Sequence, residues 1–436
     1  MADKSAKNLL KLLEKSGIAD QEELKESLGS LSAKMDGEAV GTAELTEHLI
    51  DSGIITQWHA DKLLAGKYKG FFLDKYKLLG HLGTGGMSSV YLAESKSTSK
   101  KRAIKVLPKK KVSDKSYLDR FYREGKAAAS LNHPNIVRVY DINNVGDTHY
   151  MVMEYVRGKD LYEYVRDDGA LPIDDAVDAI YQSAEGLLHA HDKGMVHRDI
   201  KPANLLKTDG GAIKILDLGL ALFNTEGEES LTVLYNEKVM GTADYLSPEQ
   251  AVNSHEVDHR ADIYSLGCTL YFLVTGRPPY NKGTLAQRIA MHQSKEPDNI
   301  LESREDCPQG LIDICTKMMR KNPLDRFEDC NQVMSVLKEF RDSPDTFRLD
   351  LPPPTPVVPK EPPVAKEVET EPVAASNPDD PYSISTPANS SFRIARAPYI
   401  RRRRRKAVPK WLMPLIIFGM IFGLIGVLVL VSMLVS

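Results

Sequence analysis

The most informative segment of the chain is His197-Arg198-Asp199-Ile200-Lys201-Pro202-Ala203-Asn204, which is followed by Asp217-Leu218-Gly219. A carboxylate, a lysine two residues later and an amide five residues later can converge from one loop, and Asp217 brings a second carboxylate. Carboxylate and amide oxygens suit the hard cation Mg²⁺. Such a combination is rare in a purely structural loop, so the segment indicates a catalytic site that uses a divalent cation.

A glycine-rich segment lies upstream, between two predicted strands, and reads Leu82-Gly83-Thr84-Gly85-Gly86-Met87-Ser88-Ser89-Val90. Glycines let backbone N–H groups approach phosphates closely. The pattern alone is weak, because it also occurs in dinucleotide-binding folds and in ordinary hairpins. A dinucleotide fold needs a helix directly after the loop, whereas Val90-Tyr91-Leu92-Ala93 continues as a strand.

A lysine stands inside an apolar strand pattern at Ala103-Ile104-Lys105. Most lysines are solvated surface groups, and a buried lysine is costly unless it meets a negative partner. Glu124, on the helical pattern that follows, could supply that partner.

Together these segments resemble the eukaryotic-type (Hanks-type) protein kinases, and specifically the bacterial serine/threonine kinases. The resemblance extends from about residue 76 to 340. It implies an α+β, two-lobed fold with an antiparallel N-lobe sheet plus one helix, and a mainly helical C-lobe. It also implies transfer of the ATP γ-phosphate to Ser/Thr hydroxyls of protein substrates, with ATP and Mg²⁺, or Mn²⁺, as cofactors.

The resemblance implies roles for individual residues. Asp199 accepts the proton of the substrate hydroxyl, Lys201 lies near the γ-phosphate and favours Ser/Thr substrates, and Asn204 and Asp217 hold the metal. The implied ATP-binding residues are Leu82, Gly83, Thr84, Gly85, Gly86, Met87, Ser88, Ser89, Val90, Ala103, Lys105, Glu124, Met153, Glu154, Val156, Asp160 and Leu206.

Within this set, residues 83–90 cover the phosphates, and Lys105 contacts the α and β phosphates and pairs with Glu124. Met153 resembles the gatekeeper, and Glu154 and Val156 offer backbone groups to adenine. Val90, Ala103 and Leu206 are implied to form the apolar walls of the base pocket. Asp160 is implied to contact the ribose.

Other segments resemble the regulatory and structural parts of such a domain. Glu249 would pair with Arg326, and Asp262 would steady the catalytic loop. Arg198 would receive a phosphorylated activation-loop residue, so we expect autophosphorylation at Ser230 or Thr232, with Thr242 nearer the substrate groove. These hydroxyl residues could also be ordinary polar loop residues.

Three positions depart from the family pattern, namely Ser88, Leu218 and Ser247. None of these changes removes a charged or metal-binding group, so we expect the activity to survive. An ATP-binding pseudokinase scaffold and a small-molecule kinase are the competing functions, and the intact polar groups and the segment Ser247-Pro248-Glu249 argue against them.

The composition is that of a globular protein. The 436 residues carry a net charge of −3, with 42% hydrophobic and 27% charged residues. These values exclude global disorder and a multi-span membrane protein. The four cysteines are scattered and lack metal-site spacing, so they read as reduced thiols of a cytosolic domain.

The chain divides into five predicted parts. Residues 1–70 form a helical accessory module without a signal peptide, with helices near 21–28, 42–52 and 56–65, which is either purely structural or regulatory. Residues 76–340 form the catalytic domain, and 345–400 a Pro-rich disordered linker. Strands of the catalytic domain are expected at 76–82, 90–94, 103–107, 136–142 and 149–154.

The C-terminal parts are a basic juxtamembrane segment, 401–410, and a transmembrane helix, 411–435, which contains no charged residue. This length suffices for about 30 Å of hydrocarbon. The basic side predicts a single-pass protein of the cytoplasmic membrane with its kinase domain in the cytoplasm. We therefore expect lipid and not nucleic acid as the partner of these arginines, and no sensor domain beyond Ser436. Gly419 and Gly423 offer a helix-pairing face, and the kinase domain is a second route to a homodimer.

Overall fold

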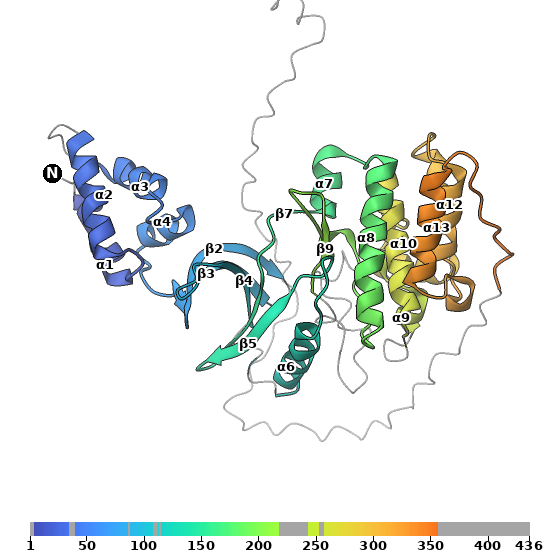
Figure 1. Ribbon diagram of the computed structural model, residues 1–436, viewed down its shortest axis with the longest axis horizontal. Helices are drawn as coiled ribbons and strands as arrows, with labels where there is room; N and C mark the ends of the chain where they lie inside the picture. Colours follow the sequence, from blue (N-terminus) through green and yellow to red (C-terminus); the bar gives the residue numbers. More distant parts are fainter. Residues whose placement is uncertain are drawn as a thin grey trace, which may run out of the picture. The chain divides into compact units, whose positions relative to one another are not determined.

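The computed structural model describes residues 4–34, 40–85, 88–107, 112, 115–217, 243–252 and 257–355. Its elements build an N-terminal helical module, an N-lobe around an antiparallel sheet and a C-lobe of helices (Figure 1). The two-lobed α+β fold expected from the sequence is confirmed.

The N-terminal module consists of α1 (Lys4–Ser16), α2 (Gln21–Lys34), α3 (Thr42–Asp51) and α4 (Gln57–Leu64). Its core is made of leucines that recur at helical spacing, among them Leu9, Leu13, Leu45 and Leu49. Helix α2 begins where the Asp20 carboxylate accepts the N–H of Glu22 at 2.9 Å. It continues past the expected end at residue 28, because Leu24 and Leu31 lie two turns apart and are both buried.

The N-lobe sheet has the strand order β1-β2-β3-β4-β6-β5 with antiparallel neighbours. Its strands are β1 (Phe72–Leu73), β2 (Tyr76–Gly85), β3 (Ser88–Ser95), β4 (Lys101–Val106), β5 (Val139–Val145) and β6 (Thr148–Glu154). Helix α6 (Lys115–Ala129) packs against one face through Phe121 and Ala128, in a cluster with Met151. The other face carries the apolar residues Ile104 and Val152, which cluster with Trp58 of α4.

One expected strand, 136–142, begins three residues later than predicted. Ile136 instead makes an isolated parallel bridge with Ile215. The N–H of Val137 donates to the Ile215 carbonyl at 3.0 Å, and the N–H of Ile215 donates to the Asn135 carbonyl at 2.8 Å. This tertiary pairing competes with the sheet for the same apolar residues and has no local signal in the sequence.

The C-lobe contains α7 (Leu161–Asp168), α8 (Ile173–His191), α9 (Pro248–Val252), α10 (Arg260–Thr275), α11 (Leu285–Ser294), α12 (Gln309–Met318) and α13 (Cys330–Asp342). A small sheet, β7 (Gly158–Asp160), β8 (Leu205–Thr208) and β9 (Ile213–Ile215), lies in this part of the chain as well. Helix α10 is buried from residue 261 to 274, so it forms the centre of the lobe. A Cβ on Gly267 would lie 2.7 Å from Met318 Cβ, so glycine is what lets α12 approach. The four cysteines are free and buried.

Residues 345–355, expected to begin the linker, make contacts with the C-lobe. The N–H of Thr355 donates to Asp325 at 2.8 Å, and Arg320 donates to the Pro352 carbonyl at 3.0 Å. Within the described ranges, no helix is both long and apolar enough to cross a bilayer. The expected span at 411–435 and the basic segment at 401–410 lie outside those ranges.

His59 of α4 makes the junction between the module and β2 sensitive to acid. The ring is fully buried, and burial lowers its pKa to about 4. The unfolded chain therefore binds a proton on this ring between pH 4 and 6.5 that the folded chain does not, so stability falls as the pH falls through this window.

We expect wild type to lose about 2 kcal/mol more stability than His59→Gln between pH 7 and pH 5. Denaturant unfolding at the two pH values measures this difference. Equal acid losses in the two proteins would contradict the buried, neutral state of His59.

Candidate active site

The sheet register gathers the N-lobe part of the candidate site. Val90 is paired directly with Lys105, and Ala103 with Met153. Directly opposed residues and residues two apart in a strand share a face. The four side chains therefore lie on one face of the sheet, opposite to the face that Trp58 and Ile104 cover.

The strands that flank the glycine-rich turn are also in register. Gly83 pairs with Val90, Thr84 with Ser89, and Gly85 with Ser88. Leu82 is 48% exposed. Gly86 and Met87, at the turn itself, lie outside the described residues.

Two further residues expected to bind the nucleotide lie on β7 and β8, where Asp160 pairs with Leu206. The Asp160 carboxylate accepts the N–H of Glu163 at 2.8 Å and so caps α7. Burial raises the pKa of Asp160 above its usual range. This residue thus has a structural role in starting α7, beside the ribose contact that the resemblance implies.

Glu154, the last residue of β6, has both its side chain and its backbone N–H engaged. Glu154 donates its N–H to the Arg138 carbonyl at 2.8 Å, and its carboxylate pairs with Lys214 at 2.9 Å. Met153 and Val156 are half-buried on either side of it. The strand thereby keeps the backbone of the expected adenine-binding segment in a fixed position.

Lys105 meets its counter-ion across the lobes. Its Nζ lies 2.7 Å from Asp217 Oδ1, and the lysine side chain is only 10% exposed. Burial disfavours the charged form of Asp217, but Lys105, with His197 and Lys201, outweighs this and holds the pKa of Asp217 below its usual range. The expected partner Glu124 lies on α6, and its side chain is outside the described part of the structure.

The side chains of Lys201 and Asn204 converge on the Asp199 carboxylate, as their spacing in the sequence suggested. Lys201 Nζ contacts both carboxylate oxygens of Asp199, at 2.9 and 2.8 Å. The amide nitrogen of Asn204 donates to the Asp199 carbonyl at 2.7 Å and to its Oδ2 at 3.0 Å. These contacts fix the Asp199 carboxylate and turn the amide oxygen of Asn204 away from it.

Asp262 is the anchor of this loop. Its two oxygens accept the N–H groups of His197 and Arg198 at 2.8 and 2.7 Å, and the ring of His191 at 2.8 Å. Burial opposes the ionisation of Asp262, but these histidine and backbone contacts keep its pKa below the usual range. Arg198 has a φ of 65° and Asp217 a φ of 52°, in the left-handed region that non-glycine residues rarely adopt.

Arg326 and Glu249 form a bidentate ion pair. Arg326 Nη1 and Nη2 donate to the two Glu249 oxygens at 2.6 and 2.7 Å. The remaining donors reach the carbonyls of Arg320, Arg260 and Lys321. All five guanidinium donors are therefore used, and the pair ties the segment at α9 to the loop before α13.

Sequence reasoning missed two contacts of the site. The His197 ring accepts the Asp199 N–H at 3.2 Å and donates to the Leu216 carbonyl at 2.8 Å, so it joins the catalytic loop to the residue before Asp217. Arg288 of α11 forms an ion pair with Asp244. The position of His197 at the start of the segment 197–204 was a sequence signal for its contacts. No sequence signal pointed to the ion pair of Arg288 with Asp244.

The residues present fit a divalent cation held together with a nucleotide. Asn204 and Asp217 offer hard oxygen donors. Among the described residues, no three His, Cys, Asp or Glu side chains gather into a metal site of their own. A cation here would therefore take its other ligands from phosphate oxygens and water, which is the usual situation for Mg²⁺. Leu218, Gly219, Ser230, Thr232 and Thr242 lie outside the described residues.

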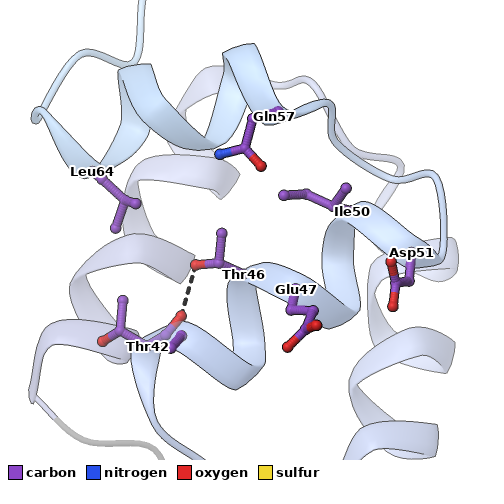
Figure 2. Close-up of a pocket in the computed structure, with 8 residues that line it drawn as sticks. Thr42, Thr46, Glu47, Ile50, Asp51, Gln57 and Leu64 are labelled. Carbon is purple, nitrogen blue, oxygen red and sulfur yellow. Dashed lines mark hydrogen bonds between the residues drawn. The ribbon is translucent and has the colours of Figure 1, made fainter. Parts of the chain in front are cut away.

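A separate pocket of about 580 Å³ lies in the N-terminal module. Figure 2 shows it between α3 and α4, with Ile50, Thr46 and Leu64 around it. None of the expected nucleotide-binding residues lines this pocket, so it is not the nucleotide site.

Comparison with known proteins gives the same result as the site geometry. The family model described as the protein kinase domain matches residues 76–337. The serine/threonine-protein kinase PrkC of Bacillus subtilis is 37% identical over 270 residues, which are 62% of this chain and 41% of PrkC. The serine/threonine-protein kinase PknB of Mycobacterium leprae is 37% identical over 268 residues, which are 61% of this chain and 42% of PknB.

Among solved structures, a double mutant of the Mycobacterium tuberculosis PknI kinase domain matches with a TM-score of 0.50 and 27% identity. The match covers 62% of this chain and 97% of that chain. The chain spans about two fifths of the length of the curated relatives that it matches.

The variant Asp262→Asn tests the anchor of the loop. It replaces one acceptor oxygen by an NH2 donor, which would face the backbone N–H of either His197 or Arg198, so we expect a loss of about 2–4 kcal/mol of stability. Asp258→Asn is the matched control, because Asp258 is exposed and makes a similar contact to the N–H of Arg260. Denaturant unfolding should show a change within about 0.5 kcal/mol for this control. Equal effects of the two substitutions would contradict the anchoring role of Asp262.

Proposed function

The chain belongs to the protein kinase domain family, and we propose that it is an active serine/threonine protein kinase that transfers the γ-phosphate of ATP to protein hydroxyls. The observation that carries the proposal is the arrangement of Asp199, Lys201 and Asn204 in direct contact within one loop, with Lys105 paired to Asp217 from the other lobe. A scaffold without turnover would have no need for this complete set.

Phosphoryl transfer demands little covalent chemistry of the protein, and requires alignment and the neutralisation of charge. Asp199 would orient the substrate hydroxyl and take its proton, since Lys201 and Asn204 fix its carboxylate. Lys105 would contact the α and β phosphates, and Lys201 the γ-phosphate. Bound Mg²⁺, held by Asn204 and Asp217, would offset the negative charge of the triphosphate.

An exchange of partners would keep both charges compensated when nucleotide binds. In the structure, Lys105 and Asp217 neutralise each other at 2.7 Å. With nucleotide bound, Lys105 would contact phosphate oxygens, and the Asp217 carboxylate would be available to hold the metal. The Lys105 ammonium, whose side chain is only 10% exposed, would keep an anionic partner throughout, and leaving it unpaired would be costly.

We further propose that the chain is anchored in the cytoplasmic membrane by residues 411–435, with the kinase domain in the cytoplasm. The support is the uncharged stretch itself and the basic residues that precede it. Residues 401–410 would contact anionic lipid. We expect the full chain to sediment with membranes after a carbonate wash and a chain ending at residue 355 to remain in the supernatant. Sedimentation of both, or of neither, would contradict the anchor.

The activity test compares Asp199→Asn and Lys105→Met with wild type in the purified full chain. Radiolabelled ATP and a generic Ser/Thr substrate measure turnover, which we expect to fall at least about a hundredfold in both variants. The thermal midpoints show whether the variants fold. Asp209→Asn is the control, because Asp209 is exposed and pairs only with Arg157 at the surface among the described ion pairs.

The same incubation tests autophosphorylation. We propose that Arg198, next to Asp199, receives a phosphate from Ser230 or Thr232. Mapping should find phosphate there in wild type and none in the Asp199 variant. Wild-type turnover by the Asp199 variant would overturn the proposed function, and an unmodified segment in active wild type would overturn autophosphorylation at these residues.

A further inference from the structure

Helix α4 of the N-terminal module contacts the sheet that carries the nucleotide-binding strands. Trp58 packs edge-on against Phe71 and Tyr91, with ring centroids 5.6 and 6.2 Å apart. Its indole belongs both to the periphery of the module core and to that of the outer N-lobe cluster. The module is therefore packed on the N-lobe through a shared apolar contact.

The contact coincides with an irregularity of β2. Leu78 pairs with Ala93 and Gly80 with Leu92, so Leu79 has no partner in β3. On the other side, β1 pairs only with Tyr76 and Lys77. Such a bulge bends a strand and leaves backbone groups without ladder partners. At Leu79 the carbonyl accepts a hydrogen bond from Thr56 Oγ1 at 2.6 Å.

His59 supports the same stretch of strand. Its Nδ1 accepts the N–H of Thr56 at 3.1 Å, so the proton is on Nε2, which donates to the Leu78 carbonyl at 2.6 Å. The ring is fully buried. Both ring nitrogens are thus used, one by the N-cap residue of α4 and one by β2.

The contact to β2 and the start of α4 depend on the same two side chains. The Thr56 hydroxyl accepts the N–H of His59 at 3.3 Å while it donates to Leu79. Thr56 and His59 form a reciprocal cap at the N-terminus of α4. A change in the position of α4 must therefore change the support of the bulge.

The bulge lies directly upstream of the glycine-rich segment. Gly83 and Thr84, further along β2, pair with Val90 and Ser89, and Val90 in turn pairs with Lys105. Because a bulge sets the local bend and twist of its strand, its geometry, together with the second register shift between His81 and Gly83, contributes to where residues 82–85 and 88–90 lie relative to Lys105.

We propose that Thr56 and His59 are positioning residues for nucleotide binding, and that they act by holding the Leu78–Gly80 bulge of β2. The N-terminal module is then a part of the ATP-binding machinery and not an independent appendage. The proposal rests on the proposed kinase function, since it assumes that residues 82–90 cover the phosphates of ATP.

The test uses the full-length chain and the substitution Thr56→Val, which keeps the shape of the side chain and removes its hydrogen bonds. We expect the KM for ATP to rise about three- to tenfold, the effect of one lost hydrogen bond. The kcat and the KM for the protein substrate should change less than twofold. Thr56→Ser keeps the hydroxyl and should restore the wild-type KM for ATP.

The matched control is Thr284→Val in α11. Thr284 forms the same kind of reciprocal cap, with Gln287, in the C-lobe. The loss of this cap should lower the unfolding midpoint and leave the KM for ATP unchanged. An unchanged KM in the Thr56→Val protein, or an equal rise in the Thr284→Val protein, would overturn the proposal.

Hydrogen exchange of residues 76–85 separates failure of this proposal from failure of the proposed function. Exchange in Thr56→Val should be faster than in wild type and in Thr56→Ser. If wild type transfers no phosphate, the kinase proposal fails, and unchanged exchange in Thr56→Val would still overturn the support of the bulge.

Discussion

The ion pair between Lys105 and Asp217 connects the two halves of the active site. A buried lysine on an apolar strand is unfavourable unless an anion lies beside it, and here the 2.7 Å contact to Asp217 provides it. The sheet register places Val90 opposite Lys105, and His197 connects the Leu216 carbonyl to the catalytic loop. Through this one contact, the nucleotide-facing strands and the residues expected to bind metal are held within reach of the same ligand.

The C-lobe makes its side of the site rigid by burying a charge. Helix α10 is inaccessible along almost its whole length, and it presents Asp262 to the N–H groups of His197 and Arg198. Those contacts hold Arg198 at a positive φ, and this backbone conformation sets the direction in which the Asp199 side chain projects. A buried carboxylate that accepts several hydrogen bonds tolerates little displacement of its donors. The loop at residues 197–199 is therefore held rigidly against α10.

The sequence was most informative where chemistry and spacing are local. The octet at 197–204 predicted a loop in which a lysine and an amide surround a carboxylate, and amphipathic periodicity predicted the helices of the N-terminal module. The strand at 136–142 was misplaced because Ile136 bridges to Ile215, a contact across the fold. His59 was not singled out, because a histidine in an amphipathic helix has no local sign that its ring will bond to a distant carbonyl. The contact of Lys105 with Asp217 was likewise decided by tertiary geometry, and its pairing with Glu124 stays a prediction because that side chain lies outside the described residues.

A crystal structure of the full chain with Mg²⁺ and a non-hydrolysable ATP analogue measures the central contact most directly. We expect the metal to be coordinated by the side-chain oxygens of Asn204 and Asp217, with Lys105 Nζ on an α- or β-phosphate oxygen. A nucleotide bound away from Lys105, or a metal without Asp217 among its ligands, would contradict the role given to this ion pair.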